Sequence, residues 1–141
     1  MKVFIYRNLN RAGHVYSIKS LEGISKGRVI GYAPRIIIDN AQLVVSQAGR
    51  ERVLKTKRKN VHAGVVGDLY MVSGWVTRMY NSQADFKYCN EEAFIKDFPV
   101  GIPIQYNPYK YKTFVNKFTE LPVYKADRVT FCNGNVGIHL K

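Results

Sequence analysis

The chain has 141 residues, of which 46% are hydrophobic and 13% aromatic, a composition that excludes intrinsic disorder and favours one folded domain, residues 1–141. Its formal net charge is +12, which favours a polyanionic partner such as nucleic acid. No apolar run approaches the roughly 18 residues of a transmembrane helix, and the N-terminus has too short an apolar stretch for a secretory signal. The sequence therefore predicts a soluble, cytoplasmic protein with no membrane partner.

Four runs in the first third of the chain have the character of β-strands. They are apolar and rich in β-branched or aromatic residues, and turn residues separate them. Pro34 lies between the third and fourth runs, where it cannot donate to a β-ladder, so it marks a bulge, an edge or a bend. The predicted strands lie within residues 3–6, 14–20, 28–34 and 35–46.

A helix is predicted over residues 47–58, where Ala, Arg, Glu, Leu and Lys predominate. Ser46 is suited to cap its N-terminus, and the last residues are basic, which suits the negative end of the helix dipole. At helical spacing, Ala48, Val53 and Leu54 can face the core. Another face of the helix would then carry Arg52, Lys55 and Lys59, at spacings of three and four residues.

The second half of the chain returns to β-like patterns. Residues 61–80 predict one long bent strand or two strands around Gly67 or Gly74, and residues 81–98 predict a loop with one helical turn near 91–96. Short runs then recur every eight to twelve residues, as in small sandwiches and barrels. Asn133-Gly134 predicts a C-terminal hairpin, because both residues tolerate the positive φ of a type I′ turn.

These elements predict a mainly β (α+β) fold: a small barrel or sandwich with one basic helix around 47–58 and a C-terminal hairpin. Cys89 and Cys132 lack the spacing of a zinc or redox site, so we expect two reduced thiols, with a disulfide as the alternative. The chain carries no nucleotide-binding glycine motif and no paired acids for metal catalysis. No cofactor and no metal are expected.

Basic residues are concentrated in the first part of the chain. Residues 1–59 contain thirteen Lys or Arg against three acids, a net charge of +10, whereas residues 60–141 contain nine against seven, a net charge of +2. Cations on one helix face displace counterions from a phosphate backbone. The alternative is a solvated helix that only keeps the protein soluble. The candidate contacts are Arg50, Arg52, Lys55, Lys57, Arg58 and Lys59.

A second candidate segment, residues 105–114, alternates tyrosines with lysines. Such a mixture offers rings for base stacking and cations for the backbone of a single strand. Along a strand, however, alternation would put the rings and the cations on opposite faces, so tyrosines packed at the end of the core are the alternative. The candidate contacts here are Tyr109, Lys110 and Lys112.

Histidine chemistry is the third possibility. A metal-independent ribonuclease needs one or two groups that move protons near neutral pH, and the chain offers His14, His62 and His139. Val61 and Ala63 flank His62 in an apolar run, which favours a histidine packed in the fold. No catalytic residue is therefore assigned.

Four segments resemble a family of small proteins of bacterial, phage and mobile-element origin. They are YRNLNRAGHVYSIK (6–19), RVIGYA (28–33), AGRERVLKTKRKNVHAGVVG (48–67) and YNPYKYKTFVNK (106–117). The resemblance spans most of the chain but not the acidic region 78–100. It implies a phage or mobile-element context and no individual residue roles.

Charge and resemblance together predict a small basic domain that binds nucleic acid, DNA or RNA, or a nucleoprotein complex, without catalysis. The alternative is an inhibitor of a host defence nuclease, of the anti-CRISPR or anti-restriction type, whose partner is a host ribonucleoprotein or nuclease. A metal-independent ribonuclease is the third possibility. The salt dependence of binding separates phosphate contacts from a protein interface.

Overall fold

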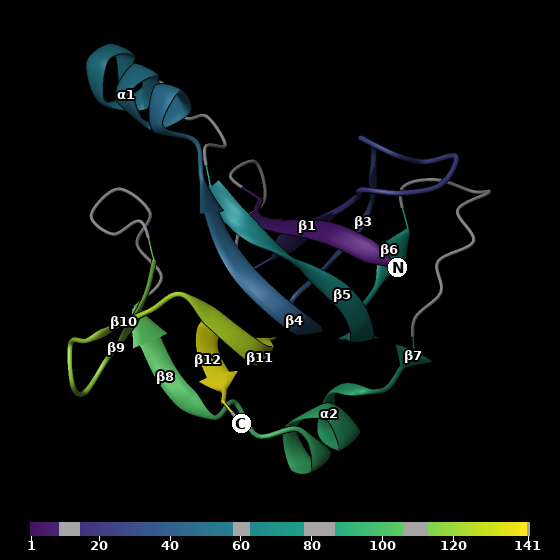
Figure 1. Cartoon of the computed structure of the whole chain (residues 1–141). Helices are drawn as coiled ribbons and strands as arrows, with labels where there is room; N and C mark the ends of the chain where they lie inside the picture. Colours follow the sequence, from purple (N-terminus) through teal and green to yellow (C-terminus); the bar gives the residue numbers. More distant parts are fainter. Residues whose placement is uncertain (9–14, 58–62, 78–86, 106–112, 141) are drawn as a thin grey trace.

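The structure is a computed structural model, and it describes residues 1–8, 15–57, 63–77, 87–105 and 113–140. Two helices and twelve strands lie in these ranges (Figure 1). In chain order they are β1 (Lys2–Arg7), β2 (Tyr16–Ser20), β3 (Val29–Ala33), β4 (Arg35–Val45), α1 (Gln47–Thr56), β5 (Ala63–Ser73), β6 (Val76–Thr77), β7 (Lys87–Tyr88), α2 (Glu91–Asp97), β8 (Ile102–Gln105), β9 (Phe114–Asn116), β10 (Pro122–Val123), β11 (Lys125–Cys132) and β12 (Asn135–His139).

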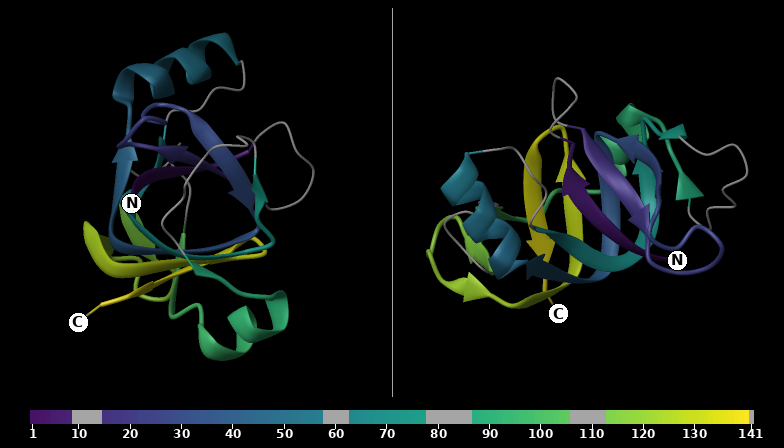
Figure 2. Two further views of the ribbon diagram at one scale, coloured as in Figure 1. Left: turned by 90° about the vertical axis from the view of Figure 1, so that its right-hand side faces the viewer. Right: turned by 90° about the horizontal axis from the view of Figure 1, so that it is seen from above.

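Eleven strands form one antiparallel path in the order β10-β9-β8-β12-β11-β4-β5-β1-β2-β3-β6, and β7 pairs with β5 in parallel. The sheet is strongly curved (Figure 2). Among the described residues, no strand pair joins β10 to β6. The predicted mainly β fold is confirmed, but the sheet is open at both ends and is not a closed barrel.

The main core lies on the concave side of this sheet. Alternate residues of β1, β4, β5 and β11 point into it, including Val3, Ile5, Ile38, Val65 and Phe131, all with an exposed fraction of 0%. Side chains alternate between this side and the outer face, as expected for β-strands, and register shifts between β4 and β5 interrupt the alternation.

A second, smaller core lies on the other face of the same sheet, beneath α2. Phe94 of α2 is fully buried there against Ile37, Met71 and Cys132. The run Ile36-Ile37-Ile38 has no exposed residue because β4 is covered on both faces at this point. Helix α2 therefore covers one part of the outer sheet face and leaves the remainder without a helix.

Helix α1 (Gln47–Thr56) confirms the predicted basic helix, but it ends before the predicted residue 58, because its C-cap Lys57 has a left-handed φ of 56°. Ser46 accepts a hydrogen bond from the Gly49 amide at 3.2 Å, as predicted for an N-cap. The prediction that Ala48 and Leu54 face the core is wrong. Only Gly49 and Val53 are buried, while Ala48 is exposed and Leu54 is 58% exposed.

Turn residues act as the sequence predicted. The segment 63–77 divides at Gly74, which has φ 77°, and gives β5 and the short β6. Asn133 and Gly134 have φ values of 50° and 95° and connect β11 to β12 as a hairpin. The helical turn predicted near 91–96 is α2, whose N-cap Asn90 accepts a hydrogen bond from the Ala93 amide at 2.7 Å.

Cys89 and Cys132 are both free thiols, in agreement with the prediction. Burial raises the pKa of each thiol, so both groups stay protonated at neutral pH. Within the described ranges, neither helix has the length and apolar character needed to cross a membrane.

Candidate nucleic-acid interface and an acidic basin

Helix α1 follows directly from β4 and lies beyond one end of the sheet, whereas α2 lies on the opposite side of the molecule (Figures 1 and 2). Helix α1 takes this position because only a narrow strip of its surface is apolar and buried. Gly49 and Val53 are four residues apart, so they contact the rest of the protein along a single line. The side of the helix that carries the exposed residues can meet a ligand.

The predicted contacts on α1 differ in their exposure. Arg52, Lys55 and Lys57 are exposed, whereas Arg50 is half-buried on the side of the helix that faces the protein. No ion pair in the described part of the chain involves Arg52, Lys55 or Lys57. The positive charge of these three side chains is therefore available to a ligand. Arg58, Lys59, Tyr109, Lys110 and Lys112 lie outside the described residues.

The strand registers bring a further cation to the same end of the sheet. Val45 pairs with Ala63, and Ile5 pairs with Val65, so the C-terminal end of β1 points toward the α1 end. Arg7, the last residue of β1, is exposed there. Sequence reasoning missed Arg7 because it lies 45 residues before Arg52, and only the strand order connects them.

Two aromatic rings lie on the outer face of β1. Phe4 and Tyr6 alternate with the core residues Val3 and Ile5, are half-buried, and have ring centroids 5.7 Å apart. A Cβ at Gly64 would meet the Phe4 ring at 2.6 Å, so Phe4 covers this glycine. Lys19 of β2 lies opposite Phe4 and is also half-buried. This aromatic and basic strand surface was not predicted.

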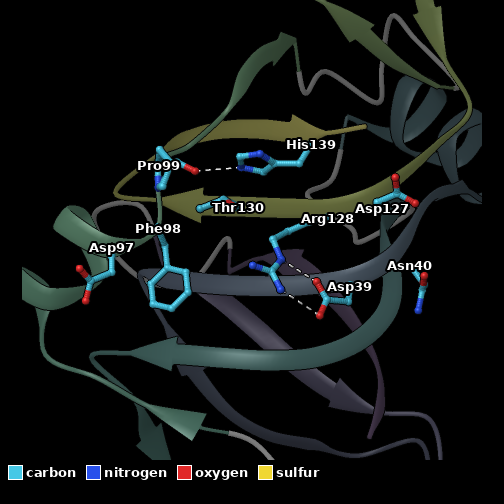
Figure 3. A pocket seen from close by; sticks show the side chains of 9 residues that line it. All are labelled: Asp39, Asn40, Asp97, Phe98, Pro99, Asp127, Arg128, Thr130 and His139. Carbon is cyan, nitrogen blue, oxygen red and sulfur yellow. Dashed lines mark hydrogen bonds and ion pairs between the residues drawn. The ribbon is translucent and has the colours of Figure 1, made fainter. Parts of the chain in front are cut away.

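A concave site lies elsewhere, on the outer face of β4, β11 and β12 next to α2, with a volume of about 530 Å³ (Figure 3). We call it the acidic basin. Arg128 donates from Nε to Oδ1 of Asp39 at 2.7 Å and from Nη2 to Oδ2 at 3.3 Å. Its guanidinium also stacks on the Tyr70 ring, 4.7 Å from the centroid. The hydrogen bond to Asp39 raises the pKa of Arg128, so this cation is permanent.

Five further polar side chains contribute to the basin lining: Asn40, Asp97, Asp127, Thr130 and His139. The two carboxylates are exposed. The Thr130 hydroxyl is fully buried and has no hydrogen-bond partner among the described residues. In the sequence, these two acids received no functional assignment, because they form no close pair of the kind that metal catalysis needs. The register that sets β11 between β4 and β12 places Asp127 and Thr130 in the same basin as Asp39, whereas Asp97 comes from α2 and lies at the opposite end of the basin from Asp127 (Figure 3).

His139 is the one candidate catalytic residue that the structure describes. Its Nε2 lies 2.9 Å from the carbonyl oxygen of Pro99, so this nitrogen donates and fixes the ring against the loop after α2. His14 and His62 lie outside the described residues. Within the described ranges, no group of three or more His, Cys, Asp or Glu is arranged to hold a metal ion.

Two comparisons with known proteins give a consistent result over most of the chain. A family model described as "Mycobacterium phage L5 gene 82 protein" matches residues 1–139. The gene 82 protein of Mycobacterium phage L5 is 36% identical over 140 residues, which cover 96% of this chain and 94% of that protein. No solved structure matches significantly.

Proposed function

The chain belongs to the family of the Mycobacterium phage L5 gene 82 protein, and in this phage context we propose that it binds nucleic acid through α1, without catalysis. The single observation that carries the proposal is a projecting helix with three exposed cations, none of which has an ion-pair partner in the described part of the chain. Like charges this close repel one another, and a phosphate backbone relieves that repulsion.

The surroundings of α1 support the same ligand. Arg7 extends the positive surface to the end of β1. Phe4 and Tyr6 offer partly exposed rings on the same strand, and bases stack on such rings in single-strand binders. The proposal therefore includes a preference for nucleic acid with unpaired bases over a continuous duplex.

The test removes three charges without disturbing the helix. The variant combines Arg52→Gln and Lys55→Gln with Lys57→Asn, because Lys57 has φ 56° and asparagine tolerates this conformation well. At about 1 kcal/mol for each lost contact, affinity for a labelled single strand should fall by roughly tenfold to a hundredfold. Fluorescence anisotropy in low salt measures it, with circular dichroism to confirm the fold.

A matched control loses the same charge elsewhere. Lys26 and Arg28 lie in the loop after β2, at the other end of the sheet, and Lys96 lies on α2; all three are exposed. Replacing each with Gln should change affinity by less than about threefold, since only long-range attraction is lost. An equal loss in both triple variants would show that net charge and not α1 directs binding.

Absence of nucleic-acid binding near physiological salt would favour the alternative, an inhibitor of a host defence nuclease of the anti-CRISPR or anti-restriction type. An apolar protein interface should resist salt better than phosphate contacts do. Cleavage of bulk RNA in EDTA, lost on His14→Ala or His62→Ala with the fold intact, would instead establish the metal-independent ribonuclease.

A further inference from the structure

We propose that the outer face of β1, β2 and β3 stacks the unpaired nucleobases of the strand whose phosphates α1 binds, an inference that rests on the proposed nucleic-acid function. The bases and the phosphates are thereby assigned to different parts of the molecule. We call this outer face the aromatic platform and define it by four partly exposed side chains: Phe4, Tyr6, Lys19 and Tyr32.

The strand registers place these four side chains on one face. Phe4 and Tyr6 alternate with buried core residues along β1, so they project outward. Residues directly opposite one another in an antiparallel pair share a face of the sheet. Phe4 lies opposite Lys19 of β2, and Tyr6 lies opposite Ser17, which in turn lies opposite Tyr32 of β3. Three rings and one cation from three neighbouring strands therefore form a single surface.

The platform continues to the edge of the sheet. Val76 of β6 lies opposite Tyr32 and is 49% exposed. The row that starts at Tyr6 therefore crosses four strands, or three strand spacings, which is roughly 14 Å. This length gives the platform room for more than one base.

No helix of the described chain covers the platform. Helix α2 packs on another part of the outer face, over Ile37 and Met71, and α1 lies beyond the end of the sheet (Figure 2). A sheet face that carries large apolar side chains is normally buried against a second layer. Aromatic rings on an uncovered face mark a surface that a partner uses.

The charge around the rings favours nucleic acid as this partner. Lys19 lies beside the rings, and no ion pair in the described part of the chain involves it. Arg7, which follows Tyr6, is exposed. Lys2 and Asp68, near the other end of β1, lie opposite each other and offset each other's charge. Rings that stack bases, next to cations that bind the backbone, are the arrangement of single-strand binders.

The platform and α1 are positioned to hold one continuous strand. The C-terminal end of β1 points toward the α1 end of the sheet, and Arg7 lies at that end. A strand bound by its phosphates at α1 would pass Arg7 before its bases reach Tyr6 and then Phe4. A second copy of this chain is a poor occupant of the platform, because each copy carries a net charge of +12.

The first test compares a labelled oligothymidine with an abasic oligomer of the same length, which keeps every phosphate and has no bases. Fluorescence anisotropy should show that the wild type binds oligothymidine at least roughly tenfold more tightly. Oligouridine, measured alongside, shows whether DNA or RNA is preferred, and tighter binding of either base-bearing strand supports the platform. Equal affinity for all three strands would overturn the platform and leave phosphate binding by α1 intact. Failure to bind any of them would contradict both proposals.

A double variant, Tyr6→Leu with Tyr32→Leu, removes two rings and keeps apolar side chains in their place. Its affinity for oligothymidine should fall roughly tenfold or more, while its affinity for the abasic oligomer stays unchanged. The matched control replaces Tyr88 and Phe118 with Leu, because these rings are 60% and 76% exposed and lie outside the platform; its affinities should equal those of the wild type. The variant of α1 should instead weaken binding of both oligomers by the same factor. An equal loss on both oligomers in the platform variant would contradict base stacking there, with circular dichroism to confirm each fold.

Photo-cross-linking locates the bases in the unmodified protein, independently of any substitution. An oligomer carrying 5-iodouracil is irradiated in complex with the wild type, and mass spectrometry identifies the attached peptides. We expect cross-links in the peptides that contain β1 and β3. Cross-links found only in α1 or in the C-terminal half of the chain would overturn the platform.

Discussion

Arg35 shows how a single polar residue fixes several elements at once. It is only 8% exposed, donates from Nε to the Ser73 hydroxyl at 3.0 Å and from Nη1 to Asn133 Oδ1 at 2.9 Å, and lies 3.5 Å from Glu91. These partners belong to β5, the C-terminal hairpin and α2. The residue therefore stabilises the fold, and its charge is not available to a polyanion.

Arg35→Ala should lower the free energy of unfolding by about 2 to 3 kcal/mol, because it leaves the buried Ser73 hydroxyl without this donor and removes a charged hydrogen bond. Arg28→Ala, at an exposed arginine, should change it by no more than about 0.5 kcal/mol. Urea denaturation measures both. A similar change in the free energy of unfolding for the two substitutions would show that the Arg35 contacts stabilise the fold no more than an exposed arginine does.

Two buried groups, Tyr16 and Cys132, and the half-buried Cys89 make stability depend on alkaline pH. Burial raises the pKa of Tyr16, Cys89 and Cys132, so the folded protein retains protons that the unfolded chain releases. Stability is complete below the ordinary thiol pKa of about 8.5 and falls as the pH rises above it. Urea denaturation between about pH 7 and pH 10 should show this decline.

The pH dependence has a direct control. The double variant Cys89→Ala and Cys132→Ala should be less sensitive over about pH 8 to 9.5, with the Tyr16 contribution left at higher pH. The native thiols should also react slowly with iodoacetamide at neutral pH and quickly in urea. Fast modification of Cys132 in the folded protein would contradict its protonated, buried state.

At the scale of the elements, the sequence predicted strands and helices well and their packing less well. The continuous Ile36-Ile37-Ile38 run is itself the signature of a strand covered on both faces, yet it does not identify the cover, which is Phe94 of α2. The predicted apolar face of α1 was too wide. Helical periodicity shows which residues can share a face, but the area that the sheet end offers decides how many are buried.

The two helix caps provide a matched pair of substitutions. Ser46→Ala and Asn90→Ala each remove one side-chain cap, and each should destabilise the protein by about 1 kcal/mol or less. Only Ser46→Ala should weaken nucleic-acid binding, by a few fold, because it loosens α1 without changing any charge. Weaker nucleic-acid binding by the Asn90→Ala variant would indicate that the interface includes α2.

At the scale of the whole molecule, the sequence did not show which strands far apart in the chain pair with one another. The order that sets β11 between β4 and β12, and β5 between β4 and β1, joins residues far apart in the chain. Arg7 reaches the α1 end of the sheet, and Asp39, Asp127 and His139 reach one basin, only through this order. Charge counting locates the basic residues in the first half of the sequence, but it could not show the acidic basin that the fold builds on another face.

The most direct test of nucleic-acid binding by α1 is the salt dependence of affinity for a labelled single strand, in the wild type and in the variant with substitutions at Arg52, Lys55 and Lys57. Each phosphate contact on a single strand contributes about 0.7 to the slope of log affinity against log salt concentration. The account predicts a steep slope for the wild type and a slope smaller by about 2 for the variant. Parallel slopes in the two proteins would contradict it.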